Sequence, residues 1–165
     1  MPVATYYFDA SDNGPTDNDA AWTNDANAFD GSTTTFASAS AGGSLPDVNV
    51  LGGGGTNAPS IGGTISQVRA RIYATNGLGP VARATIYTDA LAQSLGSIDS
   101  TAAGLGTGWG DFTTLSTPTG GWDWSILQAL EALIYTDTNN NVYRVEVEVT
   151  YTDPPITPTV AWLRA

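Results

Sequence analysis

The segment VYRVEVEVTY, from Val142 to Tyr151, decides the fold class of this chain. Apolar or aromatic residues occupy every second position: Tyr143, Val145, Val147, Val149 and Tyr151. Polar residues fill the positions between them: Arg144, Glu146, Glu148 and Thr150. A period of two predicts a β-strand with one face on a core and the other in solvent, as is typical of an antiparallel sheet. A slip of one residue would bury three charges, so the pattern also fixes the register of the strand.

Two further segments upstream alternate in the same way. ISQVRARIYAT (65–75) and VARATIYTD (81–89) are separated by a short Gly-rich and Pro-containing stretch, so we expect them to form a hairpin with a long loop. Shorter strands are predicted in TYYFD near the N-terminus and at Ser32–Ser40, Leu45–Leu51, Gln93–Ile98 and Asp111–Leu115.

The stretches between these strands have loop composition, with one exception. Residues Asp9 to Gly31 are dense in Asp, Asn, Gly and Pro, which predicts a long surface loop that Trp22 and Phe29 anchor on the body. The run LGGGGTNAPSIGG (51–63) predicts a flexible loop or a tight turn. The exception is SILQALEAL (125–133), which has helical spacing with Ser125 as N-cap.

These elements predict an all-β protein: an antiparallel β-sandwich of jelly-roll type, with one short helix and an extended C-terminal arm. Residues 1–152 would form the sandwich and residues 153–165 the Pro-rich arm. A chain of 165 residues is the size of one domain and is long enough to build its core without disulfides. It contains no cysteine, so disulfides are excluded.

The charge composition is strongly acidic and narrows the possible functions. The chain has sixteen acidic residues, no histidine and a net charge of −11. Its positive charges are five arginines: Arg69, Arg71, Arg83, Arg144 and Arg164. Such a surface repels phosphate backbones and anionic lipids, so we expect neither nucleic acid nor a membrane as partner. The N-terminal MPVATYYFDA has no basic region followed by an apolar stretch, so we expect no secretion signal.

Without histidine or cysteine, the remaining route to catalysis is a carboxylate pair of the glycosidase type. Glu146 and Glu148 share one strand face about 7 Å apart. The alternative is that both belong to a solvated strand face and lie opposite Arg69, Arg71 or Arg83. We favour this alternative and predict a protein that is not an enzyme.

The acidic loop partly matches a calcium-binding loop. Asp9, Ser11, Asn13 and Asp17 have the spacing of oxygen ligands in such loops, but Ala20 stands where the bidentate glutamate belongs. Calcium is therefore a candidate cofactor, and an ordinary solvated loop is the alternative.

Aromatic residues provide two candidate binding features. Trp109, Trp122 and Trp124 lie near Gly-rich turns and are candidates for contacts with a glycan, unless they anchor loops on the core. In the arm, prolines 154, 155 and 158 favour an extended chain, yet the sequence then becomes apolar. The candidate partner-binding residues there are Val160, Trp162, Leu163 and Arg164, which would dock on a neighbouring subunit.

Two stretches resemble known families. NAFDGSTTTFAS (27–38) resembles the early signature of galactose-binding-like jelly rolls. The segment from Trp109 to Tyr151, with PTGGWDW and its closing strand, is similar to jelly-roll proteins of tailed bacteriophage virions. The second resemblance implies a capsid decoration (cement) protein on the outer surface of the virion, assembled in the host cytoplasm. Its partners would be further copies of itself, with a trimer favoured, and the major capsid protein. The alternative is a carbohydrate-binding module, or a tail or head fibre domain, that recognises host glycans.

Overall fold

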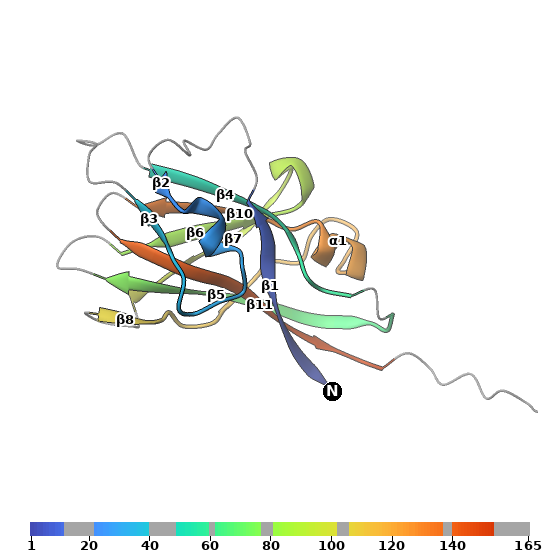
Figure 1. Ribbon diagram of the computed structural model, residues 1–165. Coiled ribbons are helices and arrows are strands. Elements are labelled where there is room, and N and C mark those ends of the chain that lie inside the picture. The colour runs from blue at the N-terminus through green and yellow to red at the C-terminus, as the bar shows by residue number, and fades with distance from the viewer. Residues whose placement is uncertain are drawn as a thin grey trace, which may run out of the picture.

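The computed structural model describes residues 1–11, 22–39, 49–59, 62–76, 81–101, 106–136 and 140–153, and most of them lie in antiparallel strands (Figure 1). The strands are β1 (Val3–Ser11), β2 (Trp22–Thr23), β3 (Ala37–Ala39), β4 (Asn49–Thr56), β5 (Ile65–Asn76), β6 (Arg83–Tyr87), β7 (Ser94–Asp99), β8 (Gly106–Trp109), β9 (Thr113–Thr114), β10 (Glu131–Thr136) and β11 (Asn141–Tyr151). The helices are α1 (Trp124–Gln128) and two 3₁₀ turns, η2 (Asp25–Ala28) and η3 (Asp89–Leu91). No helix of the described residues is long and apolar enough to cross a membrane.

The strand pairing confirms the predicted all-β sandwich of jelly-roll type. The chain folds back on itself, so that β1 pairs with β11, β4 with β10, β5 with β8 and β9, and β6 with β7. One sheet contains β1, β11, β5, β8 and β9, with β3 and β2 beside the start of β11. The other contains β4, β10, β6 and β7. We call them the first and the second sheet.

Strand β1 joins the two sheets along one side of the sandwich. Its first half, Val3 to Tyr7, pairs with β11 of the first sheet, and its second half, Phe8 to Ser11, pairs with β4 of the second. On the opposite side the sheets also approach each other. There the amide of Ser116, just after β9, donates a hydrogen bond to the carbonyl of Leu95 in β7 at 2.7 Å.

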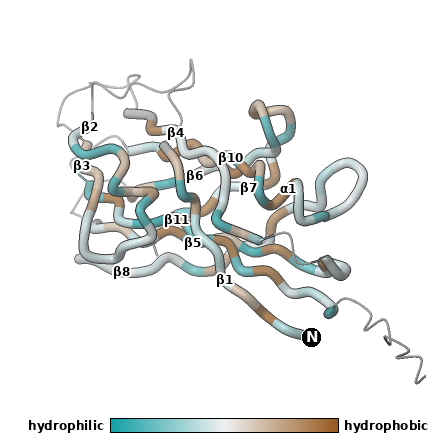
Figure 2. Tube along the Cα trace, turned by 45° about the vertical axis from the view of Figure 1, so that its right-hand side comes forward, coloured by the Kyte–Doolittle hydropathy of each residue, from teal (hydrophilic) through white to brown (hydrophobic). Residues whose placement is uncertain are grey.

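The core lies between the inner faces of the sheets. On β11 its members are Val145, Val147 and Val149, and the facing side of β5 contributes Val68, Ala70, Ile72 and Ala74, all fully buried. Hydrophobic and hydrophilic positions alternate along both strands, as the tube in Figure 2 shows. The predicted alternation is thus confirmed for these two strands, which pair over almost their whole length.

A β-bulge corrects the predicted position of Tyr143. The register of β11 against β5 shifts between Val142 and Arg144, so Val142 takes the inner position and is fully buried. Tyr143 lies instead against Tyr73 on the outer face, with 5.2 Å between the ring centroids. An extra residue in one strand changes the face on which the following side chains lie, which simple alternation cannot show.

The glycine run corrects a second prediction. Gly52 to Gly55 do not form a loop but belong to β4, between β1 and β10. A Cβ atom on Gly53 would lie 2.2 Å from a ring carbon of Phe29, so only glycine lets this ring pack on the strand. Phe29 and Trp22 are buried, which confirms them as anchors.

Other boundaries and pairings also differ from the prediction. β5 and β6 do not form a hairpin, because β6 pairs with β10 and β7 in the second sheet. Helix α1 ends at Gln128, and the last three residues of its predicted span, Glu131 to Leu133, belong to β10. Its N-cap is Asp123 rather than Ser125, and hydrogen bonds from Ser125 and Ile126 lower the pKa of the Asp123 carboxyl. The arm beyond Asp153 lies outside the described residues.

Phe29 and Gly53 should show strong energetic coupling. We expect Phe29→Ala to lower the free energy of unfolding by about 3–5 kcal/mol because it leaves a cavity. Gly53→Ala should cost about 1–3 kcal/mol or more because its methyl group overlaps the ring. In the double variant the methyl group has room, so the total loss should be smaller than the sum, as measured by urea unfolding of all four proteins. Additive losses would show that the ring does not pack on Gly53.

Candidate functional site: an arginine–aromatic face

The outer face of the first sheet collects most of the positive charge and many of the aromatic rings of the described chain. Its members are Tyr7, Phe36, Arg69, Arg71, Tyr73, Trp109, Phe112, Tyr143, Arg144, Glu146 and Glu148, and we call this surface the arginine–aromatic face. It arises because the polar positions of β11 and β5 alternate with the core positions of the same strands.

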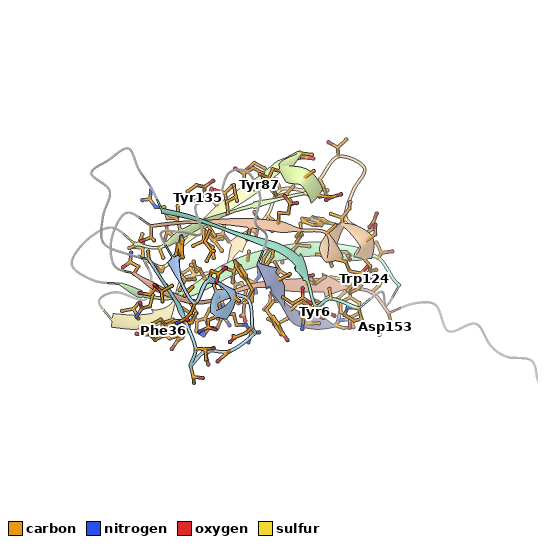
Figure 3. The ribbon with its side chains drawn as sticks, turned by 45° about the horizontal axis from the view of Figure 1, so that its top comes forward. Tyr6, Phe36, Tyr87, Trp124, Tyr135 and Asp153 are labelled. Carbon is orange, nitrogen blue, oxygen red and sulfur yellow. The ribbon has the colours of Figure 1, made fainter. Side chains whose placement is uncertain are left out.

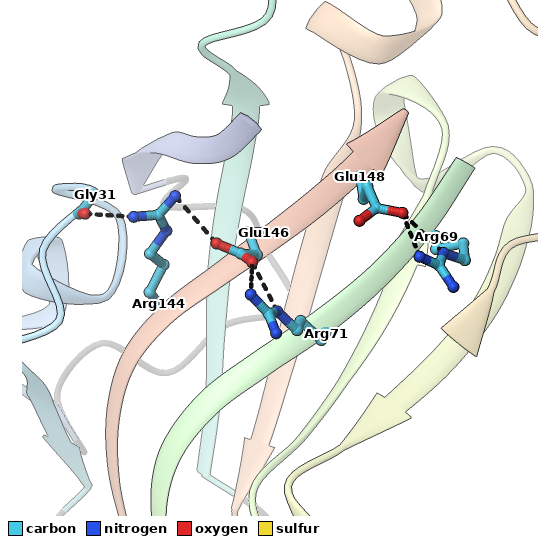
Figure 4. A network of polar contacts seen from close by, with 6 residues as sticks. All are labelled: Gly31, Arg69, Arg71, Arg144, Glu146 and Glu148. Carbon is cyan, nitrogen blue, oxygen red and sulfur yellow. Dashed lines mark hydrogen bonds and ion pairs between the residues drawn. The ribbon is translucent and has the colours of Figure 1, made fainter. Parts of the chain in front are cut away.

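Glu146 is the centre of the polar network (Figure 4). Its Oε1 accepts a hydrogen bond from Arg71 Nε at 2.7 Å and lies 2.6 Å from Arg71 Nη2. Its Oε2 lies 3.0 Å from Arg144 Nη2. The Glu146 side chain is only 3% exposed, so two guanidinium groups replace the water that this carboxylate has lost.

The second ion pair of the face is more open. Arg69 donates hydrogen bonds from Nε, at 3.0 Å, and from Nη2 to Glu148 Oε1. Arg69 is 37% exposed and Glu148 17%, and such pairs contribute little to stability. Both pairs follow from the register, because Glu146 lies opposite Arg71 and Glu148 opposite Arg69.

Arg144 connects the segment that contains Gly31 to this network. Its Nη1 donates a hydrogen bond to the carbonyl of Gly31 at 2.8 Å. Gly31 has a φ of +73°, and a Cβ atom there would lie 2.5 Å from the Tyr7 ring. Arg144 is itself 4.9 Å from the centroid of that ring. Residues 22–39 are therefore held against the face by contacts that require glycine at position 31.

The aromatic rings lie around the guanidinium groups. Arg71 is 4.0 Å from the centroid of the Trp109 ring and 4.3 Å from that of Phe112, within cation–π distance. Trp109 contacts Tyr73 at 4.9 Å between centroids. Tyr143 contacts Tyr73 on one side and Phe36 on the other, at 5.2 and 5.3 Å. The rings and charges thus form one continuous surface held by many weak contacts.

The predicted carboxylate pair lies on this face with arginine partners, as the non-catalytic alternative expected. Two details of that alternative need correction. Glu146 is buried rather than solvated, and Arg83 lies on the second sheet and contributes nothing to the network.

The three candidate tryptophans are in different environments. Trp109 lies half-buried on the arginine–aromatic face, and Trp122 is half-buried against the core. Trp124 is 6% exposed and donates a hydrogen bond from Nε1 to the Gly63 carbonyl at 3.3 Å. It packs edge to face against Tyr6, near the end of the sandwich where Asp153 lies (Figure 3), and burial there raises the pKa of Tyr6. Trp124 therefore anchors a loop on the core, which was the alternative to a glycan contact.

The calcium and arm candidates fall largely outside the described residues. Asn13 and Asp17 lie there, as do all four arm residues: Val160, Trp162, Leu163 and Arg164. β1 continues to Ser11, so exposed Asp9 lies in a paired strand and not in the expected loop. Among the described residues, no group of three acidic, histidine or cysteine side chains could hold a metal ion. Calcium binding stays a prediction.

A groove that the sequence did not suggest lies beside α1. It has a volume of about 610 Å³ and is lined by Thr88, Asp89, Ala92, Gln93, Pro118, Thr119, Ser125, Ile126 and Ala129. Next to it, Ala90 and Leu91 adopt positive φ angles of 54°, and Glu131 accepts hydrogen bonds from both of their amides. None of the lining residues is aromatic, and Glu131 already compensates the unusual backbone, so the groove shows little suited to ligand recognition.

The outer face of the second sheet differs from the arginine–aromatic face. There burial together with a hydrogen bond to Tyr87 raises the pKa of Tyr135 to about 12. Arg83 lies on the same strand as Tyr87, and no ion pair involving it is found among the described residues. The network of paired arginines is thus a property of the first sheet.

Sequence reasoning missed the aromatic partners Tyr7, Phe36 and Phe112. The alternation in TYYFD predicts a strand but does not say which tyrosine lies beside an arginine. Phe112 follows β8 and comes over Arg69 and Arg71 only because β8 and β9 pair with β5.

Comparison with known proteins gives no match. No protein-family model matches the chain, and no curated protein or solved structure is significantly similar to it.

The two glutamates of the face should differ in their contribution to stability. We expect Glu146→Gln to lower the free energy of unfolding by about 2–4 kcal/mol, because it leaves two arginines without a buried counter-charge. The matched change Glu148→Gln should cost less than about 1 kcal/mol, because its ion pair is open to solvent. Urea unfolding at neutral pH measures both. Equal losses would contradict the central role of Glu146.

Proposed function

We propose that this protein is a structural, non-enzymatic component of a tailed-phage virion, and specifically a capsid decoration (cement) protein. In this proposal it binds the major capsid protein on the outer surface of the shell and associates with further copies of itself, with a trimer favoured. The virion assignment rests on the resemblance of residues 109–151, and a jelly-roll fold alone serves many functions.

The observation that carries the proposal is the arginine–aromatic face. Trp, Tyr and Arg are the residues that most often dominate the binding energy of protein interfaces. Here Arg71 Cζ lies 4.0 Å from the centroid of the Trp109 ring and Tyr73 contacts the same ring, so these side chains restrict one another without a partner. Ordered side chains lose less conformational entropy on binding, which favours attachment to a rigid surface such as a shell.

The distribution of charge agrees with this role. The chain has a net charge of −11, but three of its five arginines lie on the arginine–aromatic face. Acidic surfaces elsewhere would keep neighbouring copies soluble and away from packaged DNA, whereas the arginines of this face would reduce repulsion of a protein partner there. Its contribution to the shell would be mechanical, through buried interface area.

Glycan recognition is the second candidate function, and Trp109 is the observation that favours it. An indole ring beside arginine and glutamate side chains is a surface on which a sugar could stack and form hydrogen bonds. This alternative uses the same face, so the two functions can be distinguished only by testing whether the face binds a protein shell or a glycan.

Attachment to particles should depend on Trp109. We expect the protein to co-sediment with purified particles in a density gradient, in amounts comparable to the major capsid protein. Trp109→Ala should weaken this association at least tenfold, since it removes the central ring of the face. Trp122→Ala is the matched control, because this ring is also half-buried but packs on the core elsewhere. Equal binding by both variants, or no protein in the particle fraction, would contradict the proposal.

Calorimetric titration separates the glycan alternative. Under the structural proposal, neutral and acidic oligosaccharides at millimolar concentration should release no binding heat from the wild-type protein. Saturable binding that Trp109→Ala abolishes and Trp122→Ala preserves would instead establish glycan recognition on the same face.

A further inference from the structure

The first half of β1 is an edge of the first sheet. Among the described residues, Val3 to Tyr7 pair with β11 on one side, and no strand continues the sheet on the other (Figure 1). Such an edge carries a row of backbone donors and acceptors that can pair with another chain.

The hydrogen bonds show which backbone groups face outward. The Tyr151 amide donates to the Pro2 carbonyl at 3.2 Å, so Pro2 and the alternate residues Ala4 and Tyr6 direct their backbone groups toward β11. The residues between them, Val3, Thr5 and Tyr7, must then direct theirs away from β11.

The contacts of Tyr7 confirm this alternation. Its amide donates to Asn57 Oδ1 at 2.9 Å, and its carbonyl accepts from the Asn57 amide at 3.0 Å. Asn57 follows β4 and therefore covers the edge at Tyr7. No described residue covers the same groups of Val3 and Thr5, so within the described part of the chain two donors and two acceptors lack a partner.

This edge also lacks the features that usually protect one. Exposed edges commonly carry a charge, a proline or a bulge that prevents pairing. Residues 3–7, VATYY, contain no charge and no proline, and they pair with β11 in regular register. Val3 is 56% exposed and Met1 80%, so apolar surface adjoins the unpaired groups.

We propose that the edge of β1 at Val3 and Thr5 accepts residues 159–164, TVAWLR, from a second copy of this chain as an added strand. The inference rests on the self-association in the proposed function and names the surface that provides it. The added strand would place alternate side chains beside Ala4 and Tyr6 on the inner side and beside Val3 and Thr5 on the outer side.

The position of Asp153 and the sequence after it support this occupant. Because Tyr151 bonds to Pro2, the chain leaves β11 beside the start of the β1 edge. Residues 154–158, PPITP, contain three prolines, which favour an extended link of about 3.1 Å per residue. A link of this kind would lead the following strand away from its own sandwich and toward a neighbour. Donor and acceptor surfaces differ, so each copy can accept one neighbour and donate to another; such exchange gives a closed ring, such as a trimer, where the rotation between successive copies closes.

The test uses the full-length chain, with mass measured by light scattering and amide exchange measured by NMR. We expect an oligomer in which the amides of Val3 and Thr5 exchange at least 100-fold more slowly than in an unstructured peptide. Val3→Lys on the acceptor and Leu163→Asp on the donor should each give a monomer and remove this protection. Gln67→Lys is the matched control, because it adds the same charge at an exposed position of β5 and should change neither result.

Two results would overturn the inference. An oligomer with unprotected Val3 and Thr5 amides would mean that another surface mediates assembly. A monomer with protected amides would mean that the segment covers the edge of its own chain. Neither result bears on particle attachment through Trp109, so this inference and the proposed function can fail separately.

Discussion

The pairing of β11 with β5 is the constraint on which the rest of the structure depends. The inner residues of these strands form the centre of the core, and the outer residues between them form the ion pairs of the arginine–aromatic face. Glu146 and Val147 are neighbours in sequence, yet one compensates two arginines while the other is fully buried among aliphatic side chains. Core and face therefore share one register, and a slip that harmed one would destroy the other.

The sequence predicted those parts of the fold that depend on local alternation. β5 and β11 follow a period of two, so their existence, their faces and the sandwich class could be inferred. The partner of each strand could not be inferred, because alternation shows which face of a strand is buried but not which strand forms hydrogen bonds along its edge. The residues that β5 and β11 pair are separated by about half the chain. The prediction of a β5–β6 hairpin, which assumed pairing between neighbours in sequence, was therefore wrong. The prediction of a loop or turn for the glycines of β4 was also wrong, because the Phe29 ring that requires a bare backbone at Gly53 is distant in sequence.

The candidate site was predictable to the same extent. The opposition of Glu146 and Glu148 to arginines of β5 was among the expected arrangements, because charged positions on facing strands tend to pair. The gathering of aromatic rings around Trp109 could not be predicted, since these rings come from five separate segments that only the completed fold brings together. Trp109 and Trp124 both follow a glycine-rich stretch, and sequence offers no reason why one lies on the surface and the other in the core.

The passage of β1 from one sheet to the other has a consequence for mechanical strength. One continuous strand is bonded to β11 along its first half and to β4 along its second. A force applied along β1 would act on both sets of hydrogen bonds in shear, so many bonds would have to break together rather than one after another. The two layers therefore cannot slide apart without first extracting a strand that belongs to both, which would suit the load-resisting role proposed above.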